Sequence, residues 1–169
     1  LASRQGTLPA ALIVSDPGWH AGVVGLVASR LAEKLHRPTL ALAPAGLDGA
    51  EWRGSGRSIA GFHLRDALVE LDRRHPHLLL RFGGHAMAAG ITVDPGQMAT
   101  LGSAFESVAD DLLDESTRTR SVWTDGPLAA NEFTLDLAQA IESAGPFGQA
   151  FAEPLFDNEF LVLDRRVLK

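Results

Sequence analysis

The stretch of sequence that decides the fold is Phe82-Gly83-Gly84-His85-Ala86-Met87-Ala88-Ala89-Gly90. Its paired glycines allow positive φ and leave backbone N–H groups uncovered, which suits a close approach to an anion. The small residues that follow the histidine predict a helix packed closely against its neighbour. We therefore interpret the stretch as a glycine-rich loop that opens a helix and binds an anion.

A second stretch of the same character, Gly54-Ser55-Gly56-Arg57-Ser58, lies about thirty residues earlier. It predicts a turn that ends a strand at about 50–58. The guanidinium of arginine is a planar fork of donors that matches phosphate oxygens, and the two hydroxyls add further donors. Either stretch alone is typical of an ordinary turn. As a pair they predict a site for a phosphate or phosphodiester, with the candidates Ser55, Gly56, Arg57, Ser58, Gly83, Gly84 and His85.

The bulk composition is that of a globular protein, with 169 residues, 46% hydrophobic residues, 21% charged residues and no cysteine. The formal net charge of −6 argues against a protein that coats nucleic acid generally, but the charge is segregated. Residues 52–85 hold six arginines and three acids, whereas residues 94–115 hold six acids and no base. No apolar run is long enough for a membrane span, and no signal peptide is evident, so we expect a cytoplasmic protein. Because the chain begins at Leu1, it is interpreted as part of a longer protein.

Hydrophobic periodicity predicts an α/β fold with a mixed sheet flanked by helices. A strand, a helix and a strand follow one another within about 35 residues, which predicts a βαβ unit with a parallel pair. His20 follows the first of these strands, at the sheet edge where α/β proteins bind ligands, and it is equally well explained as a helix cap. The expected elements are strands at 10–14, 39–43, 50–58 and 89–93 and helices at 24–35, 62–74 and 98–112.

The composition changes at residues 116–121, which are interpreted as a linker. Beyond the linker we expect strands near 121–128 and 155–168, a helix near 134–143, and a turn at Gly145-Pro146-Phe147-Gly148. These elements are too few for a core of their own. They predict the beginning of a β-rich domain.

The sequence offers little for cleavage of a phosphodiester. Metal-assisted hydrolysis needs several carboxylates and histidines close together, and no such spacing occurs near the glycine motifs. His75-Pro76-His77 is interpreted as a loop and not as a metal site. A nucleotide-binding P-loop and a Gly-x-Ser-x-Gly nucleophile motif are both absent from the sequence. We therefore expect a chain that binds a phosphate without metals of its own.

Gly83-Gly84-His85-Ala86-Met87-Ala88-Ala89-Gly90 resembles the signature of the DHH-associated domain, the substrate-binding half of the DHH phosphoesterases. Two further stretches, Trp19–Gly25 and Gly54–Phe62, resemble the other motifs of its RecJ branch, which are single-stranded-DNA-specific 5′→3′ exonucleases. Gly145–Gly148, followed by Glu153-Pro154, is similar to the start of that family's oligonucleotide-binding (OB) β-barrel. The resemblance covers almost the whole chain.

The resemblance implies a linker at 1–9, a DHH-associated domain at 10–115, a linker at 116–121 and the beginning of an OB-like domain at 122–169. It implies that Ser55 and Arg57 hold the 5′ phosphate of single-stranded DNA and that His85 faces the scissile phosphate. The Asp and Asp-His-His motifs that bind Mn²⁺ or Mg²⁺ in the family are absent from this sequence. The metals are therefore expected in another domain of the parent enzyme, which acts in DNA repair and recombination, and this chain alone is expected to be inactive.

Two other functions remain open at this stage. One is a DHH-family phosphodiesterase for short oligonucleotides or cyclic dinucleotides. The other is a non-catalytic interaction module, in which the acidic helix at 97–115 docks a partner such as a single-strand-binding protein. Binding that depends on Asp110, Asp111 and Asp114 instead of Arg57 would favour the module.

Overall fold

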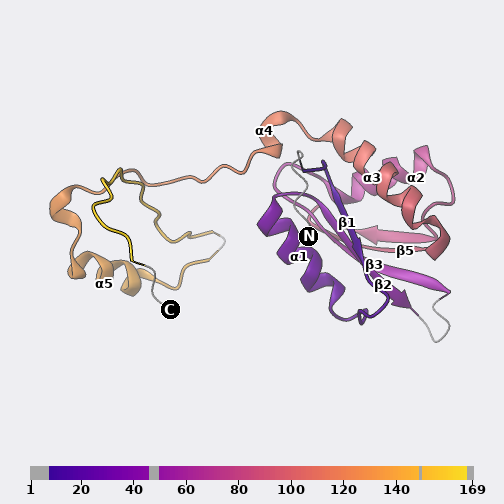
Figure 1. Ribbon diagram of the computed structural model, residues 1–169, viewed down its shortest axis with the longest axis horizontal. Helices are drawn as coiled ribbons and strands as arrows, with labels where there is room; N and C mark the ends of the chain where they lie inside the picture. The colour runs from indigo at the N-terminus through magenta and orange to yellow at the C-terminus, as the bar shows by residue number, and fades with distance from the viewer. Residues whose placement is uncertain (1–7, 46–49, 149, 167–169) are drawn as a thin grey trace. The chain divides into compact units, whose positions relative to one another are not determined.

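The computed structural model describes residues 8–45, 50–148 and 150–166. The chain divides into two compact units, Leu1–Arg120 and Ser121–Lys169. The first unit is built on a five-stranded sheet with the strand order β1-β2-β3-β5-β4 (Figure 1). The strands are β1 (Leu12–Ser15), β2 (Thr39–Ala45), β3 (Glu51–Arg57), β4 (Arg81–Gly84) and β5 (Ala88–Val93).

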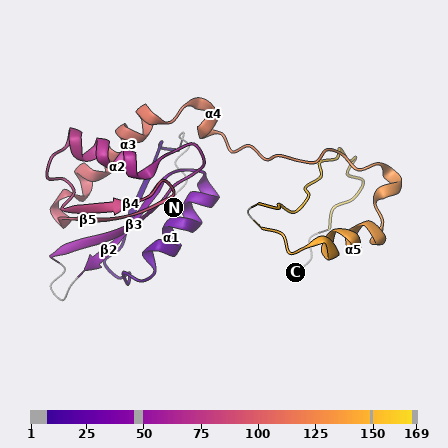
Figure 2. The ribbon, with the colours of Figure 1, turned by 180° about the vertical axis from the view of Figure 1, so that it is seen from behind.

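The sheet is mixed, as predicted. β1 and β2 are parallel and are joined through α1 (Val24–Leu35), which is the expected βαβ unit, whereas the other neighbouring strands pair antiparallel. Figures 1 and 2 show α1 on one side of the sheet and α2 (Leu64–Arg74) with α3 (Met98–Leu112) on the other. The predicted α/β fold class is confirmed.

The core lies between the sheet and the pair α2–α3. Alternate residues of a strand point to opposite faces, and one face of this sheet supplies Leu40, Leu42, Ile91 and Val93 to the core. Buried residues of α2 and α3, spaced three and four apart, meet them there. On the opposite face a smaller cluster packs Val24 and Ala28 of α1 on Ala41 and Ala43 of β2.

The stretch that was expected to open a helix forms a β-hairpin instead. Phe82, Gly83 and Gly84 belong to β4, and Ala88, Ala89 and Gly90 begin β5. The backbone N–H of His85 donates to the carbonyl of Ala88 at 2.8 Å across the turn. Six residues of β5 pair with β3, so the small residues serve strand packing and no helix N-terminus exists here to bind an anion.

The second glycine stretch is also not a turn. Gly54, Ser55, Gly56 and Arg57 lie within β3, paired with β2 on one side and β5 on the other. Glycine is rare in strand interiors and marks places where other groups approach closely. A Cβ atom at Gly54 would lie 2.7 Å from the side chain of Leu42, so the glycine makes room for the core.

The segment interpreted as a linker contains a short helix, α4 (Glu115–Arg118). The carboxylate of Asp114 caps this helix by accepting from the backbone N–H of Thr117 at 2.6 Å. Arg37 donates to the carbonyl of Arg118, and the ring Nε2 of His36 lies 3.1 Å from the carbonyl of Thr117. Residues 116–118 are therefore attached to the first unit.

The second unit contains the predicted helix, α5 (Leu135–Ala144), preceded by a 3₁₀ turn, η2 (Ala130–Glu132). The predicted strands at 121–128 and 155–168 do not form in the part of this unit that the structure describes, which ends at residue 166. Two backbone hydrogen bonds join the two segments: the N–H of Asp125 donates to the carbonyl of Leu155, and the N–H of Asp157 donates to the carbonyl of Gly126. Two bonds are too few for a β-ladder. No described residue of this unit is buried. The two segments therefore gain no stability from a buried apolar face that would hold them together as strands.

Candidate functional site

One face of the sheet is exposed beside α1. Directly paired residues share a face, and the residues that β3, β5 and β4 present on the α1 side form three rows across the sheet. We call these residues the open face. They are Arg53, Thr92 and Arg81 in one row, Ser55, Gly90 and Gly83 in the next, and Arg57 with Ala88 in the last.

Arg57 and Ser55 are held together on the open face. One guanidinium nitrogen of Arg57, Nη1, donates to the hydroxyl of Ser55 and to the carbonyl of Gly56, each at 2.8 Å. Its Nε and Nη2 have no hydrogen-bond partner within the described residues, and no described acid pairs with it. This unused edge of the guanidinium can bind two oxygens of a phosphate.

The first turn of α1 lies directly against this pair. A Cβ atom at Gly25 would lie 3.3 Å from both Nη2 of Arg57 and the hydroxyl oxygen of Ser55. Because a side chain at this position would press on both groups, Gly25 leaves space for them. Gly25 is the last residue of the Trp19–Gly25 motif, but it was not among the predicted site residues.

His85 lies in the turn between β4 and β5, and its side chain is exposed. The carbonyls of Met87 and Ala86 accept from the backbone N–H groups of Ser58 and Leu64, which fixes the turn to the segment that follows β3. Since Arg57 pairs with Ala88 in the sheet register, His85 and Arg57 lie at the same end of the sheet. The two motifs are thus neighbours in space, as the phosphate-site prediction requires.

The two glycines before His85 have different surroundings. A Cβ atom at Gly83 would meet nothing within 4 Å, so this residue leaves bare backbone on the open face. Gly84 has φ +148°, and a Cβ atom there would overlap the carbonyl oxygen of Ala88. Glycine at position 84 is therefore required by the hairpin itself.

Gly56 and Ser58, two other phosphate-binding candidates, face the core. Gly56 is buried, and a Cβ atom there would lie 2.7 Å from Leu40 and 2.8 Å from Leu64. The hydroxyl of Ser58, a residue only 8% exposed, donates to the carbonyl of Phe62 at 2.6 Å. The structure thus gives both residues a packing role.

His20 lies in the loop between β1 and α1. Its Nδ1 accepts from the backbone N–H of Gly22 at 3.0 Å, and its side chain is exposed. The Nδ1–H tautomer is excluded by this bond, so the neutral ring carries its proton on Nε2, where it can be donated. His20 therefore orders the loop that leads to Gly25 and retains one free donor.

Two cationic residues of the open face were not among the sequence candidates. Arg53 and Arg81 are both exposed and flank Thr92 on neighbouring strands. The spacing of Arg53, Ser55 and Arg57 by two residues would have indicated a shared strand face. That signal was missed because the glycines around Ser55 were interpreted as a turn.

The described residues offer no donor set for Mn²⁺ or Mg²⁺. No group of three or more His, Asp or Glu side chains gathers in the described part of the chain. Glu51, the acid of β3 nearest the open face, is bound to Arg81 at 2.7 Å. A resident metal therefore does not fit the described residues. None of the helices in the described ranges has the length and apolar character needed to cross a membrane.

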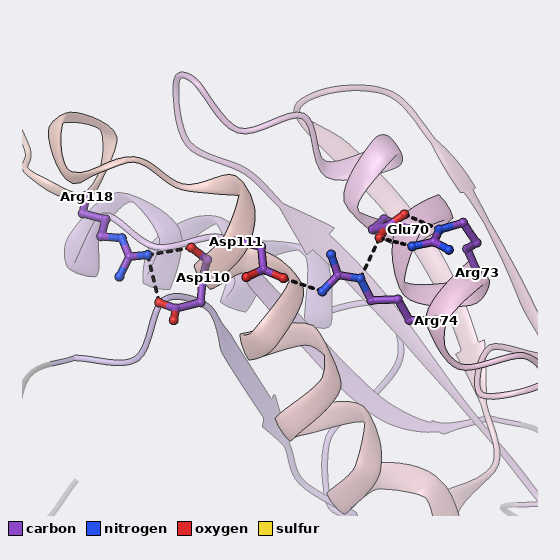
Figure 3. Close-up of polar contacts among 6 residues, drawn as sticks. All are labelled: Glu70, Arg73, Arg74, Asp110, Asp111 and Arg118. Carbon is purple, nitrogen blue, oxygen red and sulfur yellow. Dashed lines mark hydrogen bonds and ion pairs between the residues drawn. The ribbon is translucent and has the colours of Figure 1, made fainter.

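Acidic side chains of α2 and α3 form ion pairs with arginines of the same unit (Figure 3). Glu70 of α2 accepts from Arg73 and Arg74, Asp111 of α3 accepts from Arg74, and Asp110 pairs with Arg118. Hydrogen bonds from Arg73 and Arg74 lower the pKa of Glu70 to about 2. The predicted separation of basic and acidic surfaces is therefore incomplete, because α2 and α3 neutralise each other in part.

Three comparisons with known proteins agree with one another. A family model described as the DHHA1 domain matches residues 9–111, and one described as the RecJ OB domain matches residues 124–169. The single-stranded-DNA-specific exonuclease RecJ of Dickeya dadantii is 49% identical over 168 residues, which cover 99% of this chain and 29% of that relative.

Two solved structures share the fold. The crystal structure of RecJ in complex with Mg²⁺ from Thermus thermophilus superimposes with a TM-score of 0.69 at 29% identity, over 90% of this chain and 23% of that chain. The corresponding complex with Mn²⁺ gives a TM-score of 0.68 at 31% identity, over 87% of this chain and 21% of that chain. The chain thus spans less than a third of these relatives, and the resemblance drawn from the sequence motifs is confirmed.

Proposed function

The chain belongs to the DHHA1 domain family and continues into a RecJ OB domain segment, and on this basis we propose that it is the substrate-binding part of a single-stranded-DNA-specific 5′→3′ exonuclease. The open face binds the 5′ end of the DNA, and hydrolysis takes place in the parent enzyme. The relative from Dickeya dadantii, which matches 99% of this chain, carries single-stranded-DNA-specific exonuclease in its name. DNA repair and recombination in the cytoplasm belong to the same proposal.

The observation that carries the proposal is the pair formed by Arg57 and Ser55. Arg57 is fixed by two hydrogen bonds of 2.8 Å and keeps Nε and Nη2 available to a ligand. A terminal phosphate carries more charge and more free oxygens than an internal phosphodiester, so a bidentate guanidinium favours it. Gly83 and Gly90 leave the adjacent backbone bare, which allows the sugar and base to lie close to the sheet.

His85 contributes at the bond that is cleaved. Its imidazole is exposed at the sheet end that carries Arg57, where it can donate a hydrogen bond to a non-bridging oxygen as charge develops. Mn²⁺ or Mg²⁺, held by another domain of the parent enzyme, would supply the activated water. The OB segment adds contacts to the single strand, and a single-strand-binding protein is a candidate partner.

The structure gives the interaction-module alternative no support. Asp110 and Asp111 are in ion pairs with Arg118 and Arg74, and Asp114 caps α4. Neutralising these acids would disturb contacts within the unit whether or not a partner binds there.

Steady-state kinetics test the division of roles between Arg57 and His85 in a full-length exonuclease that contains this chain. Arg57→Gln should raise KM for 5′-phosphorylated DNA about tenfold or more, because the variant cannot form the charge-assisted hydrogen bonds. His85→Ala should lower kcat about a hundredfold while KM changes little, because its hydrogen bond strengthens only in the transition state. An unchanged KM in the first variant would remove Arg57 from the site, and a change in KM alone in the second would refute the role of His85.

A further inference from the structure

The row of the open face farthest from Arg57 forms a second cationic position. Arg53 of β3 and Arg81 of β4 both pair with Thr92 of β5, so the two arginines lie on either side of Thr92 and on the same face of the sheet. The Cα atoms of directly paired residues are about 5 Å apart, so the Cα atoms of the two arginines are about 10 Å apart on either side of Thr92. Two arginines and a hydroxyl at this separation can surround a single phosphate.

A shallow hollow lies at this row. Its volume is about 360 Å³, and Arg53, Arg81, Thr92, Gly83 and Gly90 contribute to its lining. Thr92 is only 7% exposed, and its hydroxyl has no hydrogen-bond partner within the described ranges. Both arginines are exposed, and no acid among the described residues pairs with Arg53.

The neighbouring row has almost no side chains. Ser55, Gly90 and Gly83 lie between the Arg53 row and the Arg57 row, and both glycines are exposed. Arg53 and Arg57 are four residues apart in β3, which corresponds to about 13 Å. The open face thus presents cationic groups at both ends and a bare glycine strip between them.

We propose that Arg53 and Arg81, with the hydroxyl of Thr92, bind a second phosphate of the single strand, downstream of the 5′-terminal phosphate held by Arg57. This inference rests on the proposed function, because it requires that the 5′ end lies at Arg57. The glycine strip accommodates the intervening nucleotide, and the second phosphate site holds the strand along the sheet. A mononucleotide bound at Arg57 does not reach this subsite, which only an oligonucleotide fills.

The ion pair between Glu51 and Arg81 provides a second test of this subsite. The carboxylate of Glu51 lies 2.7 Å from the guanidinium of Arg81, a residue that lines the hollow, and the side chains of Glu51 and Arg81 are 38% and 64% exposed. A phosphate arriving at this row competes with Glu51 for Arg81 and is repelled by its charge. Removing that charge with Glu51→Gln should therefore strengthen binding, whereas a purely structural ion pair would give no such gain.

The test compares thymidine 5′-monophosphate with a 5′-phosphorylated thymidine hexamer, each binding to the 169-residue chain. Arg53→Gln should lower hexamer affinity about tenfold and leave mononucleotide affinity unchanged. The slope of log K against log salt should become shallower by about 0.7 for each phosphate that the protein no longer neutralises. Arg81→Gln should act in the same direction, and Glu51→Gln in the opposite one. Arg65→Gln, an exposed arginine on α2, is the matched control and should change nothing.

The two proposals fail separately. If Arg53→Gln and Arg81→Gln bind the hexamer as wild type does, while Arg57→Gln loses the preference for a 5′ phosphate, the second subsite is refuted and the proposed function stands. Equal reductions in mononucleotide and hexamer affinity in Arg53→Gln would also refute the subsite, because they would show a general charge effect. If Arg57→Gln keeps the full 5′-phosphate preference, the proposed function is refuted and the subsite falls with it.

Discussion

The guanidinium of Arg57 donates a hydrogen bond of 2.8 Å to the hydroxyl of Ser55, two residues earlier on the same face of β3. The bond uses Nη1 and leaves the edge formed by Nε and Nη2 available to other partners. A side chain that is already ordered loses less conformational entropy when a ligand binds. The pair therefore presents a preformed donor edge in the absence of DNA.

A substitution at Gly25 of α1 should change the position of the Arg57–Ser55 pair without lowering the stability of the fold. Gly25→Ala places a Cβ atom 3.3 Å from Nη2 of Arg57 and from the Ser55 hydroxyl, so the guanidinium must shift. We expect affinity for a 5′-phosphorylated oligonucleotide to fall about threefold to tenfold. The thermal midpoint should stay the same or rise, since alanine favours a helix over glycine by up to about 1 kcal/mol.

Gly102→Ala in α3 is the matched control, because a Cβ atom there meets nothing within 4 Å. It should raise stability in the same way and leave oligonucleotide affinity unchanged. Equal affinities for both variants and wild type would show that Gly25 has no part in the site.

The glycines of the hairpin should differ in their effect on stability. Gly84→Ala forces a residue with a side chain to adopt φ +148°, with its Cβ atom against the Ala88 carbonyl oxygen. We expect a decrease of about 2–3 kcal/mol in the free energy of unfolding, measured with urea. Gly83→Ala, one position earlier and open to solvent, should change it by about 0.5 kcal/mol or less. A stable Gly84→Ala variant would contradict the hairpin geometry.

Much of the first unit could be predicted from the sequence because its signals are local. The stripes of Val24, Ala28 and Ala32 in α1 and of Leu64, Leu68 and Leu71 in α2 mark the buried faces of those helices. The parallel pair β1–β2 follows from the order of these segments along the chain. Such periodicity needs no knowledge of distant partners.

The glycine motifs could not be predicted in the same way. Position 56 needs a glycine because Leu40 and Leu64 pack where its Cβ atom would be. These two residues are 16 positions before and 8 positions after it, so the requirement is not visible in the local sequence. Ala88 and Gly90 extend because β3 pairs with them, although small residues alone also suit a helix. The sequence therefore indicated that Ser55 and Arg57 belong together, but not that Gly56 and Ser58 face the core.

In the second unit, the strands predicted from the sequence do not form in the described residues. Residues 121–124 (Ser-Val-Trp-Thr) are typical of a strand, although Asp125-Gly126-Pro127 is a turn sequence. Strand formation also needs a continuous ladder of hydrogen bonds and a buried face. Trp123 is 90% exposed, and no hydrophobic layer covers it in the described ranges. The composition of a segment therefore did not predict its pairing.

Acid should weaken the ion pairs that Glu70 forms with Arg73 and Arg74 within α2. Hydrogen bonds from these two arginines lower the pKa of Glu70 from 4.5 to about 2. A carboxyl whose pKa is lowered in the folded state stabilises the fold above its unfolded pKa and loses that contribution as the pH falls toward the folded pKa. Stability to urea should therefore fall between about pH 4.5 and pH 2, and less steeply in Glu70→Gln.

Glu106→Gln, which changes an exposed acid of α3 with no ion pair in the described ranges, is the control for this window. Its pH profile should follow that of wild type. If Glu70→Gln and wild type lose stability in parallel, the ion pairs of Glu70 contribute nothing measurable.

The most direct test of the account is the affinity of the 169-residue chain for one single-stranded oligonucleotide carrying either a 5′ phosphate or a 5′ hydroxyl, measured over a range of salt. The account predicts tighter binding of the phosphorylated form, a preference that disappears in Arg57→Gln and in Ser55→Ala. Ser58→Ala should retain the preference while losing about 1 kcal/mol of stability, because its hydroxyl bonds to Phe62 in the core. Weak binding that ignores the 5′ group and falls steeply with salt would contradict the account, since it would leave only diffuse electrostatic attraction on the open face.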